Sequence, residues 1–156
     1  MTKEAELISQ VREDFIEKIG MIAQAEGLPR IAGRVLATLV YDGQRVSFGE
    51  LANSLGVSRG SISSSVRLLE DRQIIKRVAK PADRQDYFEV AEDAFINLIE
   101  TSAIKARRAC KDIRDTLQKL PKSEIGPHAR LTNYANFYDV IDAALIDAAD
   151  QMRQRK

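Results

Sequence analysis

Apolar side chains recur three and four positions apart over most of this 156-residue chain, which is the spacing of one face of an α-helix. Residues 4–26 follow this spacing and predict an amphipathic helix that ends where Gly27 favours a left-handed cap. A second, mostly apolar helix is expected over about 30–41, with Pro29 near its first position. Gly33 within that helix permits a close crossing with a neighbouring element.

Two longer helices are expected in the second half of the chain, over about 92–119 and about 129–153. Pro121, Gly126 and Pro127 interrupt the pattern between them, since proline and glycine rarely continue a helix. The apolar stripe of the first helix of the chain consists of Leu7, Ile8, Val11, Phe15, Ile19 and Ile22. The stripes of the last two consist of Phe95, Leu98, Ile99, Ser102, Ala106, Cys110, Ile113, Leu117 and Leu120, and of Leu131, Tyr134, Tyr138, Ile141, Leu145, Ala148 and Met152.

A pair of shorter helices is predicted between residues 47 and 72. Ser47 and Glu50 have the spacing of a capping box, in which each side chain bonds a backbone N–H group at the start of a helix. Gly56 suits the left-handed position that ends this helix, and Ser58 suits the N-cap of the next one. The buried positions are predicted to be Leu51, Ala52 and Leu55 in the first helix and Ile62, Val66 and Leu69 in the second.

The hydrophobic period changes after Gln73, where β-branched and aromatic residues become frequent. One strand is predicted from Ile74, Ile75 and Val78, and a second from Tyr87, Phe88 and Val90. The segment 80–86 between them contains Pro81 and Asp83, which favour a turn. Helix, tight turn, helix and β-hairpin over residues 47–90 are the layout of a winged helix-turn-helix, which places its second helix in the DNA major groove. We therefore predict a mainly α fold with a small β-wing.

The outward side of the second short helix carries small, polar and basic residues. Serine hydroxyls bond to bases or phosphates, and arginine can bond guanine through two hydrogen bonds. The residues predicted to face bases are Arg59, Gly60, Ser61, Ser63, Ser64 and Arg67, and Ser58 joins this DNA-binding set while it caps the helix. Phosphate contacts are predicted for Arg59, Lys76, Arg77 and Lys80, and a minor-groove contact for Arg84 near the tip of the hairpin. The alternatives are a solvated, Ser-rich helix face and an ordinary exposed hairpin.

These segments resemble the winged-helix domain of the MarR-type transcriptional regulators, and most of all their GbsR-like branch, the regulators of glycine-betaine synthesis. The resemblance covers about residues 27–90 and is carried by Gly27-Leu28-Pro29-Arg30-Ile31-Ala32-Gly33-Arg34, by GVSRGSISSSVRLLE and by KPADRQDYFEV. MarR-type wings often contain Asp-Arg-Arg where this chain has Asp83-Arg84-Gln85, so the second arginine of that pattern is absent. The resemblance implies a homodimer that represses or modulates transcription, often relieved by a small ligand; choline-related or phenolic effectors are implied by the resemblance alone.

The long helices outside the winged core have apolar stripes that this small core cannot cover, so they need other partners. A two-fold dimer in which the first and last helices interlock is the expected arrangement, and a three-helix bundle within a monomer is the alternative. We expect one regulator domain over 1–156, with a DNA-binding core over 30–90 and a helical dimerisation region over 1–27 and 92–156. Such a dimer would hold two recognition helices about 34 Å apart and read a palindromic operator.

Composition narrows the other functions that the chain can have. One cysteine excludes an internal disulfide framework, and one cysteine with one histidine argues against a zinc site. No apolar run is long enough to span a membrane and no signal-peptide pattern is present, so a cytoplasmic protein is expected. The net charge is only +1, but residues 58–84 hold seven basic and three acidic side chains, a local +4, whereas residues 1–27 hold three basic and six acidic, a local −3.

Two residues that can carry chemistry have a more ordinary interpretation here. Cys110 lies on an apolar stripe, as a buried cysteine usually does, and not in the exposed setting that a redox sensor needs. His128 follows Pro127 at a predicted helix start, where a capping or surface role is expected in place of metal ligation or catalysis.

The aromatic residues Tyr134, Phe137 and Tyr138 are expected in a core or an interface, with the wall of an aromatic ligand pocket as the alternative. Asp83 and Asp86 have no nucleophile or metal motif nearby, so no acid–base pair is predicted. The sequence thus predicts a sequence-specific DNA-binding regulator, a homodimeric repressor that is not an enzyme and needs no cofactor. The rivals are a winged-helix protein-interaction module, which need not keep a basic, Ser-rich face, and a ligand-handling enzyme, for which the catalytic constellation is missing.

Overall fold

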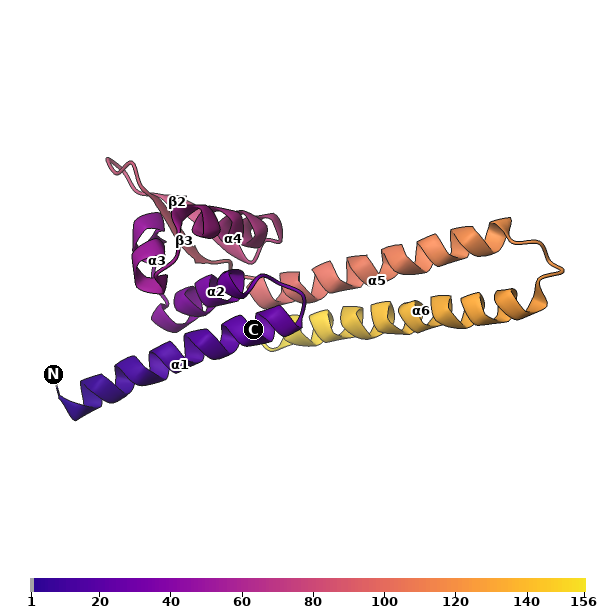
Figure 1. Cartoon of the computed structure of the whole chain (residues 1–156), viewed down its shortest axis with the longest axis horizontal. Coiled ribbons are helices and arrows are strands. Elements are labelled where there is room, and N and C mark those ends of the chain that lie inside the picture. The colour runs from indigo at the N-terminus through magenta and orange to yellow at the C-terminus, as the bar shows by residue number, and fades with distance from the viewer. Residues whose placement is uncertain (1) are drawn as a thin grey trace. The chain divides into compact units, whose positions relative to one another are not determined.

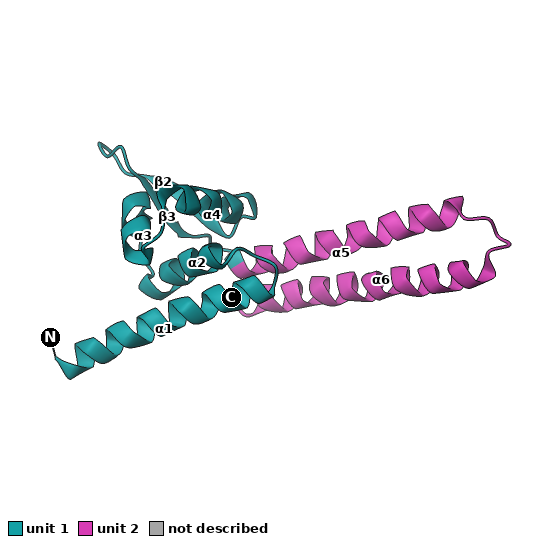
Figure 2. Ribbon diagram, viewed as in Figure 1, with its two compact units in different colours: residues 1–94 teal, residues 95–156 magenta. Residues whose placement is uncertain are grey.

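The computed structural model describes residues 2–156, which divide into two compact units with the boundary after Ala94 (Figure 2). In chain order the elements are α1 (Lys3–Ala25), α2 (Arg30–Asp42), β1 (Val46–Ser47), α3 (Phe48–Leu55), α4 (Arg59–Asp71), β2 (Ile75–Ala79), β3 (Asp86–Val90), α5 (Ala94–Lys119) and α6 (Ile125–Gln154) (Figure 1). The three strands form one antiparallel sheet in the order β1-β3-β2. The predicted mainly α fold with a small β-wing is therefore confirmed.

Two features differ from the sequence-based expectation. Strand β1 is not predicted because its two residues are too few to show an alternating pattern, yet Val46 pairs with Phe88 of β3. Helix α6 begins at Ile125, so Gly126 and Pro127 lie in its first turn and do not precede it. The backbone N–H groups of a first turn have no partner within the helix, so the proline removes no hydrogen bond there.

Helices α1 and α2 cross with their backbones close together at two glycines. A Cβ atom placed on Gly33 would lie 2.5 Å from the Cβ of Ala23 and 2.8 Å from the carbonyl oxygen of Ile19, both too close for real atoms. Gly20 faces the same crossing, and its Cβ would lie 2.8 Å from Cγ of Arg34. The expected close crossing at Gly33 is confirmed, and α1 is the helix that approaches.

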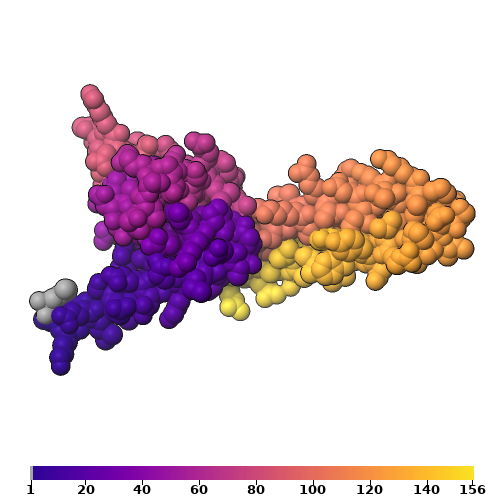
Figure 3. Space-filling view, in the orientation of Figure 1, coloured from indigo at the N-terminus to yellow at the C-terminus, as the bar shows by residue number. Residues whose placement is uncertain are grey.

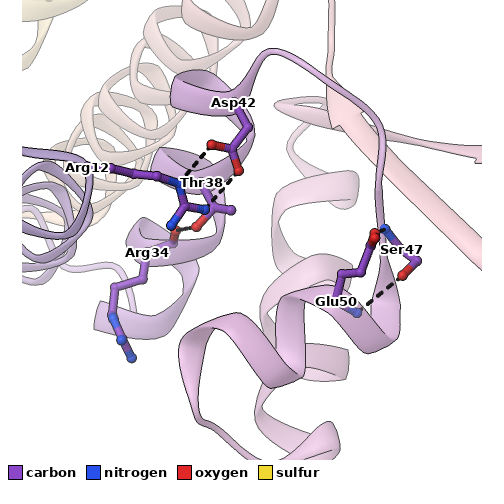
Figure 4. A network of polar contacts seen from close by, with 6 residues as sticks. All are labelled: Arg12, Arg34, Thr38, Asp42, Ser47 and Glu50. Atoms are coloured by element: carbon purple, nitrogen blue, oxygen red, sulfur yellow. Dashed lines mark hydrogen bonds and ion pairs between the residues drawn. The ribbon is translucent and has the colours of Figure 1, made fainter. Parts of the chain in front are cut away.

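Two arginines join α1, α2 and α3 around this crossing, and Figure 4 shows the link from Arg12 to Asp42. Arg12 of α1 donates hydrogen bonds of 2.8 Å from Nε and Nη2 to the two carboxylate oxygens of Asp42, at the end of α2. Arg34 of α2 forms an ion pair with Glu17 of α1, with 2.7 Å between Nε and Oε1, and donates a 3.2 Å hydrogen bond to the carbonyl oxygen of Leu55, at the end of α3. The hydrogen bond with Asp42 is the main cause that raises the pKa of Arg12.

The start and end of α3 follow the predicted signals. Ser47 Oγ accepts the backbone N–H of Glu50 at 3.2 Å, and the Glu50 carboxylate accepts the N–H of Ser47 at 2.8 Å, which confirms the capping box (Figure 4). Gly56 ends the helix with a left-handed φ of 62°. The predicted stripes of α3 and α4 are all buried, and they comprise Leu51, Ala52, Leu55, Ile62, Val66 and Leu69. The core of this unit is completed by the fully buried side chains of Val35, Leu39, Ile74 and Phe88.

Helix α1 packs against α2 with a side that differs from the one that carries most of its large apolar residues. Its buried residues are Ile16, Gly20 and Ala23. The members of its predicted apolar stripe that are at least half exposed are Leu7, Ile8, Val11 and Ile22. The stripe is therefore predicted correctly as apolar, but a single chain leaves most of it uncovered.

The second unit is an antiparallel pair formed by α6 and all but the first residue of α5. Ion pairs between the helices join Arg107 to Asp142, Arg114 to Asp139 and Arg153 to Glu100. Apart from Ile96 near the start of α5, its buried side chains are small, namely Ala103, Ala106, Cys110, Ala135 and Ala149. The large apolar side chains that stay exposed are Phe95, Ile104, Ile125, Tyr134, Phe137, Val140, Ile141, Ile146 and Met152.

Replacing Gly33 with alanine is expected to destabilise the protein by about 1–3 kcal/mol, because the new methyl group must push α1 and α2 apart. This loss should appear although alanine favours a helix by roughly 1 kcal/mol over glycine. Denaturant unfolding followed by circular dichroism measures the difference. Gly126→Ala is the matched control, since its nearest neighbour is the flexible guanidinium of Arg130. An equal loss of stability in both variants would contradict the crossing as the cause.

Candidate nucleic-acid interface

Burial of one stripe determines which side of α4 faces outward. Ile62, Val66 and Leu69 are at most 2% exposed, and Ser65 is buried beside them. The outward residues are Arg59, Gly60, Ser64 and Arg67, with Ser61 and Ser63 half-buried at the border. The structure therefore brings the polar and basic residues predicted on α4 together on one face.

Hydrogen bonds organise the serine hydroxyls at the start of α4. Ser58 Oγ accepts the backbone N–H of Ser61 at 3.1 Å, which confirms its N-cap role, and donates to Ser61 Oγ at 3.0 Å. Ser64 Oγ donates to the carbonyl oxygen of Gly60, one turn earlier, at 3.1 Å. Because its proton is used within the helix, Ser64 is left as a hydrogen-bond acceptor for an outside group.

A shallow hollow of about 470 Å³ lies along this face. Its walls are formed by Pro29 and Ile31 near the start of α2 and by Ser58, Gly60, Ser61, Ser64 and Ser65 of the α4 segment. Sequence reasoning does not assign Pro29 and Ile31 to the site, because α2 and α4 meet only through tertiary packing. The small side chains of α4 leave room for another molecule to approach the helix backbone.

The six basic residues predicted to contact DNA fall into two groups. The first group is exposed and, among residues 2–156, has no carboxylate within ion-pair distance; it consists of Arg59, Arg67, Lys80 and Arg84. The second group is paired with carboxylates and consists of Lys76 and Arg77. An unpaired cation can bind a phosphate directly, whereas a paired one must share or lose its carboxylate first.

Arg77 is used inside the fold. Its Nε and Nη2 donate to the carboxylate of Glu70 on α4 at 3.0 and 3.1 Å, and its Nη1 donates to Asp86 on β3 at 2.8 Å. The hydrogen bond with Glu70 is the main cause that raises the pKa of Arg77. Arg77 therefore braces β2 against α4 and β3, a role that depends on strand register and has no local signal in the sequence.

Lys76 has a looser pairing on the other face of the same strand. Its Nζ lies 3.0 Å from one oxygen of Glu89, whose second oxygen accepts a hydrogen bond of 3.0 Å from Arg45. The contact with Lys76, followed by that with Arg45, lowers the pKa of Glu89. The Lys76 side chain is more than half exposed, so its ammonium group retains donors that face solvent.

Asp83 shapes the wing, the loop between β2 and β3 that projects from the body of its unit (Figure 3). Its Oδ1 accepts the backbone N–H of Gln85 at 2.9 Å, and its Oδ2 accepts the hydroxyl of Tyr87 at 2.7 Å. The Gln85 N–H is the main cause that lowers the pKa of Asp83. The ammonium group of Lys80 lies 4.0 Å from the centre of the Tyr87 ring. Asp83 thus holds the loop in shape next to the exposed Arg84.

A second groove, of about 520 Å³, lies where α3, α4 and the wing meet. Its lining consists of Phe48, Gly49, Arg59, Arg84, Gln85 and Asp86. The guanidinium of Arg59 lies 4.7 Å from the centre of the Phe48 ring, within cation–π distance. Phe48 and Gly49 are missing from the sequence-based site. The sequence offers one hint that the two residues are equivalent: Phe48 follows the N-cap Ser47, just as Arg59 follows the N-cap Ser58.

The side chains of Cys110 and His128 contact neighbouring residues of the fold. Cys110 is buried as predicted; its Sγ lies 3.2 Å from Asp139 Oδ1 and accepts a 3.2 Å hydrogen bond from Nε of Arg114. His128 Nε2 lies 3.2 Å from the carbonyl oxygen of Leu120, just after α5. Within residues 2–156, no three histidine, cysteine or acidic side chains form a group that could hold a metal ion. None of the helices described in that range is both long and apolar enough to cross a membrane.

The three aromatic residues of α6 form an exposed cluster. Tyr138 lies 5.2 Å from Tyr134 and 5.1 Å from Phe137 between ring centres, and the two tyrosine hydroxyls are 3.2 Å apart. Tyr134 and Phe137 are about half exposed, so their expected place in a core is wrong for the single chain. An interface and a ligand pocket remain as predictions for this cluster.

Comparisons with known proteins agree on the kind of protein. The MarR family model matches residues 26–86, from the end of α1 to the start of β3. The HTH-type transcriptional regulator MmpR5 of Mycobacterium tuberculosis is 32% identical over 144 residues, which span 91% of this chain and 87% of that protein. The HTH-type transcriptional repressor OpcR of Bacillus subtilis is 26% identical over 125 residues, or 73% of this chain and 68% of that protein. A crystal structure of a transcriptional regulator, 28% identical, superposes with a TM-score of 0.77 and covers 92% of this chain and 98% of its own.

Asp83→Asn is expected to lower the pKa of Tyr87 toward the ordinary tyrosine value of about 10, because the hydrogen bond to the Asp83 carboxylate is the main cause that raises it. NMR titration of ring-labelled tyrosine measures this pKa. The chain has four tyrosines, and Tyr41 serves as an internal control in the same spectra. A Tyr87 pKa that stays raised in the variant would place the cause outside the wing contact described here.

Proposed function

This chain belongs to the MarR family of transcriptional regulators, and from that premise we propose that it is a homodimeric repressor that reads a palindromic operator and is released by a small ligand. Its DNA-binding role follows from the family and from its winged helix-turn-helix fold. The observation that carries the proposal is the outward face of α4, where serine hydroxyls lie beside arginines that have no carboxylate partner in the described part of the chain. A helix face built only for solubility does not need a cluster of serines, which are mediocre helix formers.

We propose that α4 enters the major groove and that its outward residues read bases. Arg67 is a donor for guanine, and Ser64, whose proton is held by Gly60, is an acceptor for the amino group of adenine or cytosine. Gly60 lets the backbone approach the base edges. The remaining members of this reading surface are Ser58, Arg59, Ser61 and Ser63.

Phosphate contacts supply the affinity that does not depend on sequence. Lys80 and Arg59 are the strongest candidates, since neither has a carboxylate partner within residues 2–156. Lys76 can contribute with the part of its ammonium group that faces solvent. We assign Arg77 mainly to bracing the wing, because its three bonds to Glu70 and Asp86 occupy the guanidinium. Arg84 is carried on the wing, where entry into the neighbouring minor groove is the sequence-based prediction.

The proposal of a homodimer rests on uncovered apolar side chains. Val140 and Phe137 of α6 are 67% and 53% exposed, and Leu7 of α1 is 63% exposed. Exposed apolar surface of this extent usually marks an interaction site. We propose that the helical regions 1–27 and 92–156 cover one another between two copies, while 30–90 remains the DNA-binding core.

The exposed aromatic cluster of α6 suits either the dimer interface or the wall of an effector pocket between the helices. We place the chain in the GbsR-like branch on its sequence resemblance, and we propose repression because OpcR, a relative, is named a repressor. A regulator of this kind has no catalytic activity and works in the cytoplasm, where the chromosome lies. The alternative is a winged-helix protein-interaction module that does not bind DNA, and the unpaired basic face argues against it.

Selection from a pool of random duplexes at several salt concentrations tests the proposed function. We expect a palindrome to be enriched, and the logarithm of the binding constant to fall with log salt by about 0.9 for each phosphate contact. Unfolding in denaturant removes any co-purified ligand, so a refolded sample serves as the control. Weak binding without sequence preference by the refolded protein would contradict the proposal and favour the interaction module.

Within that experiment, Arg67→Ala tests base reading. It should weaken binding to the selected operator by about 1–3 kcal/mol and relax the preference at one base pair in each half-site. Lys80→Ala is the matched control, since loss of a phosphate contact should weaken binding equally on all duplexes and reduce the salt slope by about one. Equal loss on operator and random DNA for Arg67→Ala would remove it from the reading surface.

Paired substitution of Phe137 and Val140 with aspartate is expected to raise the dissociation constant of the dimer more than about 100-fold, because an unpaired charge in an interface costs about 3–5 kcal/mol. Sedimentation equilibrium measures the change. Asn136→Asp, on a neighbouring exposed position of α6, controls for added negative charge. A doubly substituted protein that dimerises like the natural chain would remove this part of α6 from the interface.

A further inference from the structure

The groove at the junction of α3, α4 and the wing has a composition that suits an anion. Two of its six lining residues are Arg59 and Arg84, which are exposed and have no ion-pair partner within residues 2–156. Its one carboxylate, Asp86, already accepts a 2.8 Å hydrogen bond from Arg77, which offsets its charge. Two arginines against one partly offset carboxylate leave the groove, of about 520 Å³, with a net positive charge.

The position of Arg59 is constrained by a neighbouring ring. Phe48 is the first residue of α3 and Arg59 is the first residue of α4, and the guanidinium lies 4.7 Å from the centre of the ring. An arginine side chain loses much rotational freedom when it binds a ligand, and this loss opposes binding. A ring that already holds the guanidinium reduces that loss, since Arg59 is ordered before the ligand arrives.

The wall of the groove next to Phe48 is open backbone. A Cβ atom placed on Gly49 would meet no neighbour closer than Oε1 of Gln85, at 4.0 Å. The fold therefore does not require glycine at this position for packing, and the residue sits in α3, where alanine is favoured over glycine. Glycine here leaves the groove wide enough for a group outside the protein to approach the backbone.

We propose that this groove holds one phosphodiester group of the DNA backbone between Arg59 and Arg84, and that Phe48 is a positioning residue that acts through Arg59. This inference rests on the proposed DNA-binding function and makes it more specific. It places Arg84 on a phosphate, whereas the sequence-based prediction places it in the minor groove. It also adds Phe48 and Gly49 to the interface, although neither residue has a side chain that can form a hydrogen bond with a base.

A double-mutant cycle on Phe48 and Arg59 tests the positioning role, with dissociation constants measured on the selected operator and on random DNA. Phe48→Leu, which keeps an apolar side chain but removes the ring, should weaken binding to both duplexes by about two- to fivefold. Phe48→Tyr, which keeps the ring, should bind both duplexes with the affinity of the natural chain. In a background that carries Arg59→Ala, Phe48→Leu should have no further effect. Equal effects of Phe48→Leu with and without Arg59 would overturn the positioning role and leave Phe48 as packing.

The clamp itself is tested with Arg84 and Gly49. Arg84→Ala should weaken binding equally on duplexes with A·T-rich and G·C-rich flanks and reduce the salt slope by about one. A larger loss on A·T-rich flanks would place Arg84 in the minor groove and overturn the clamp. Gly49→Ala should leave the melting temperature unchanged or higher while it weakens DNA binding. Unchanged DNA affinity in Gly49→Ala would likewise overturn the clamp.

The natural chain distinguishes failure of this inference from failure of the proposed function. If it enriches a palindrome with a steep salt slope but the Phe48, Arg84 and Gly49 variants give the contrary results above, only the phosphate clamp is wrong. If the natural chain binds no duplex with sequence preference, the proposed function is wrong and the clamp falls with it.

Discussion

The interface depends on the rotation of α4 about its own axis, and burial of Ile62, Val66 and Leu69 determines that rotation. Each such side chain contributes about 1.5–3 kcal/mol when it leaves water. A rotation that exposed them would also bury Arg67 without a partner, which is strongly unfavourable. The outward display of serines and arginines is therefore the other side of the same hydrophobic packing. A residue at any outward position of α4 therefore faces solvent because of this packing, and no additional contact is needed to orient it.

The pairing of charges, and not their total, gives the face its positive character. The net charge of the chain is +1, which suggests little affinity for DNA. Glu70 and Asp86 are bound by Arg77, and Glu89 is bound by Lys76 and Arg45, so these carboxylates are largely neutralised within the sheet and its supports. Among the basic residues predicted to contact DNA, those without a carboxylate partner in the described residues are Arg59, Arg67, Lys80 and Arg84. In the proposed complex, Arg77 would help DNA binding indirectly, because its ion pairs reduce the competition of Glu70 and Asp86 with phosphate.

Signals that act within one turn of chain could be predicted from the sequence, and contacts between distant elements could not. The Ser47–Glu50 capping box, the left-handed Gly56 and the buried stripe of α4 each depend on residues three or four positions apart. Strand β1 and the brace of Arg77 depend on the register of β3, which two residues of strand pattern cannot reveal. The contact of Phe48 with Arg59 and the place of Ile31 beside the serines of α4 depend on how helices pack. For that reason, the residues on the outward face of α4 could be predicted one by one, whereas the groove beside that face could not.

The distribution of large and small apolar residues is the structural support for the proposed dimer. In the first unit, α1 meets α2 at Gly20, Gly33 and Ala23, and Ile16 is the one large apolar side chain of α1 that is buried. In the second unit the buried residues are mostly alanines, while isoleucines and aromatic residues are exposed. A protein that folded alone would gain more by the reverse choice, since large apolar side chains contribute most when buried. Both units show the same unusual distribution independently, and the proposed dimer, in which a second copy covers these helices, would account for it in each.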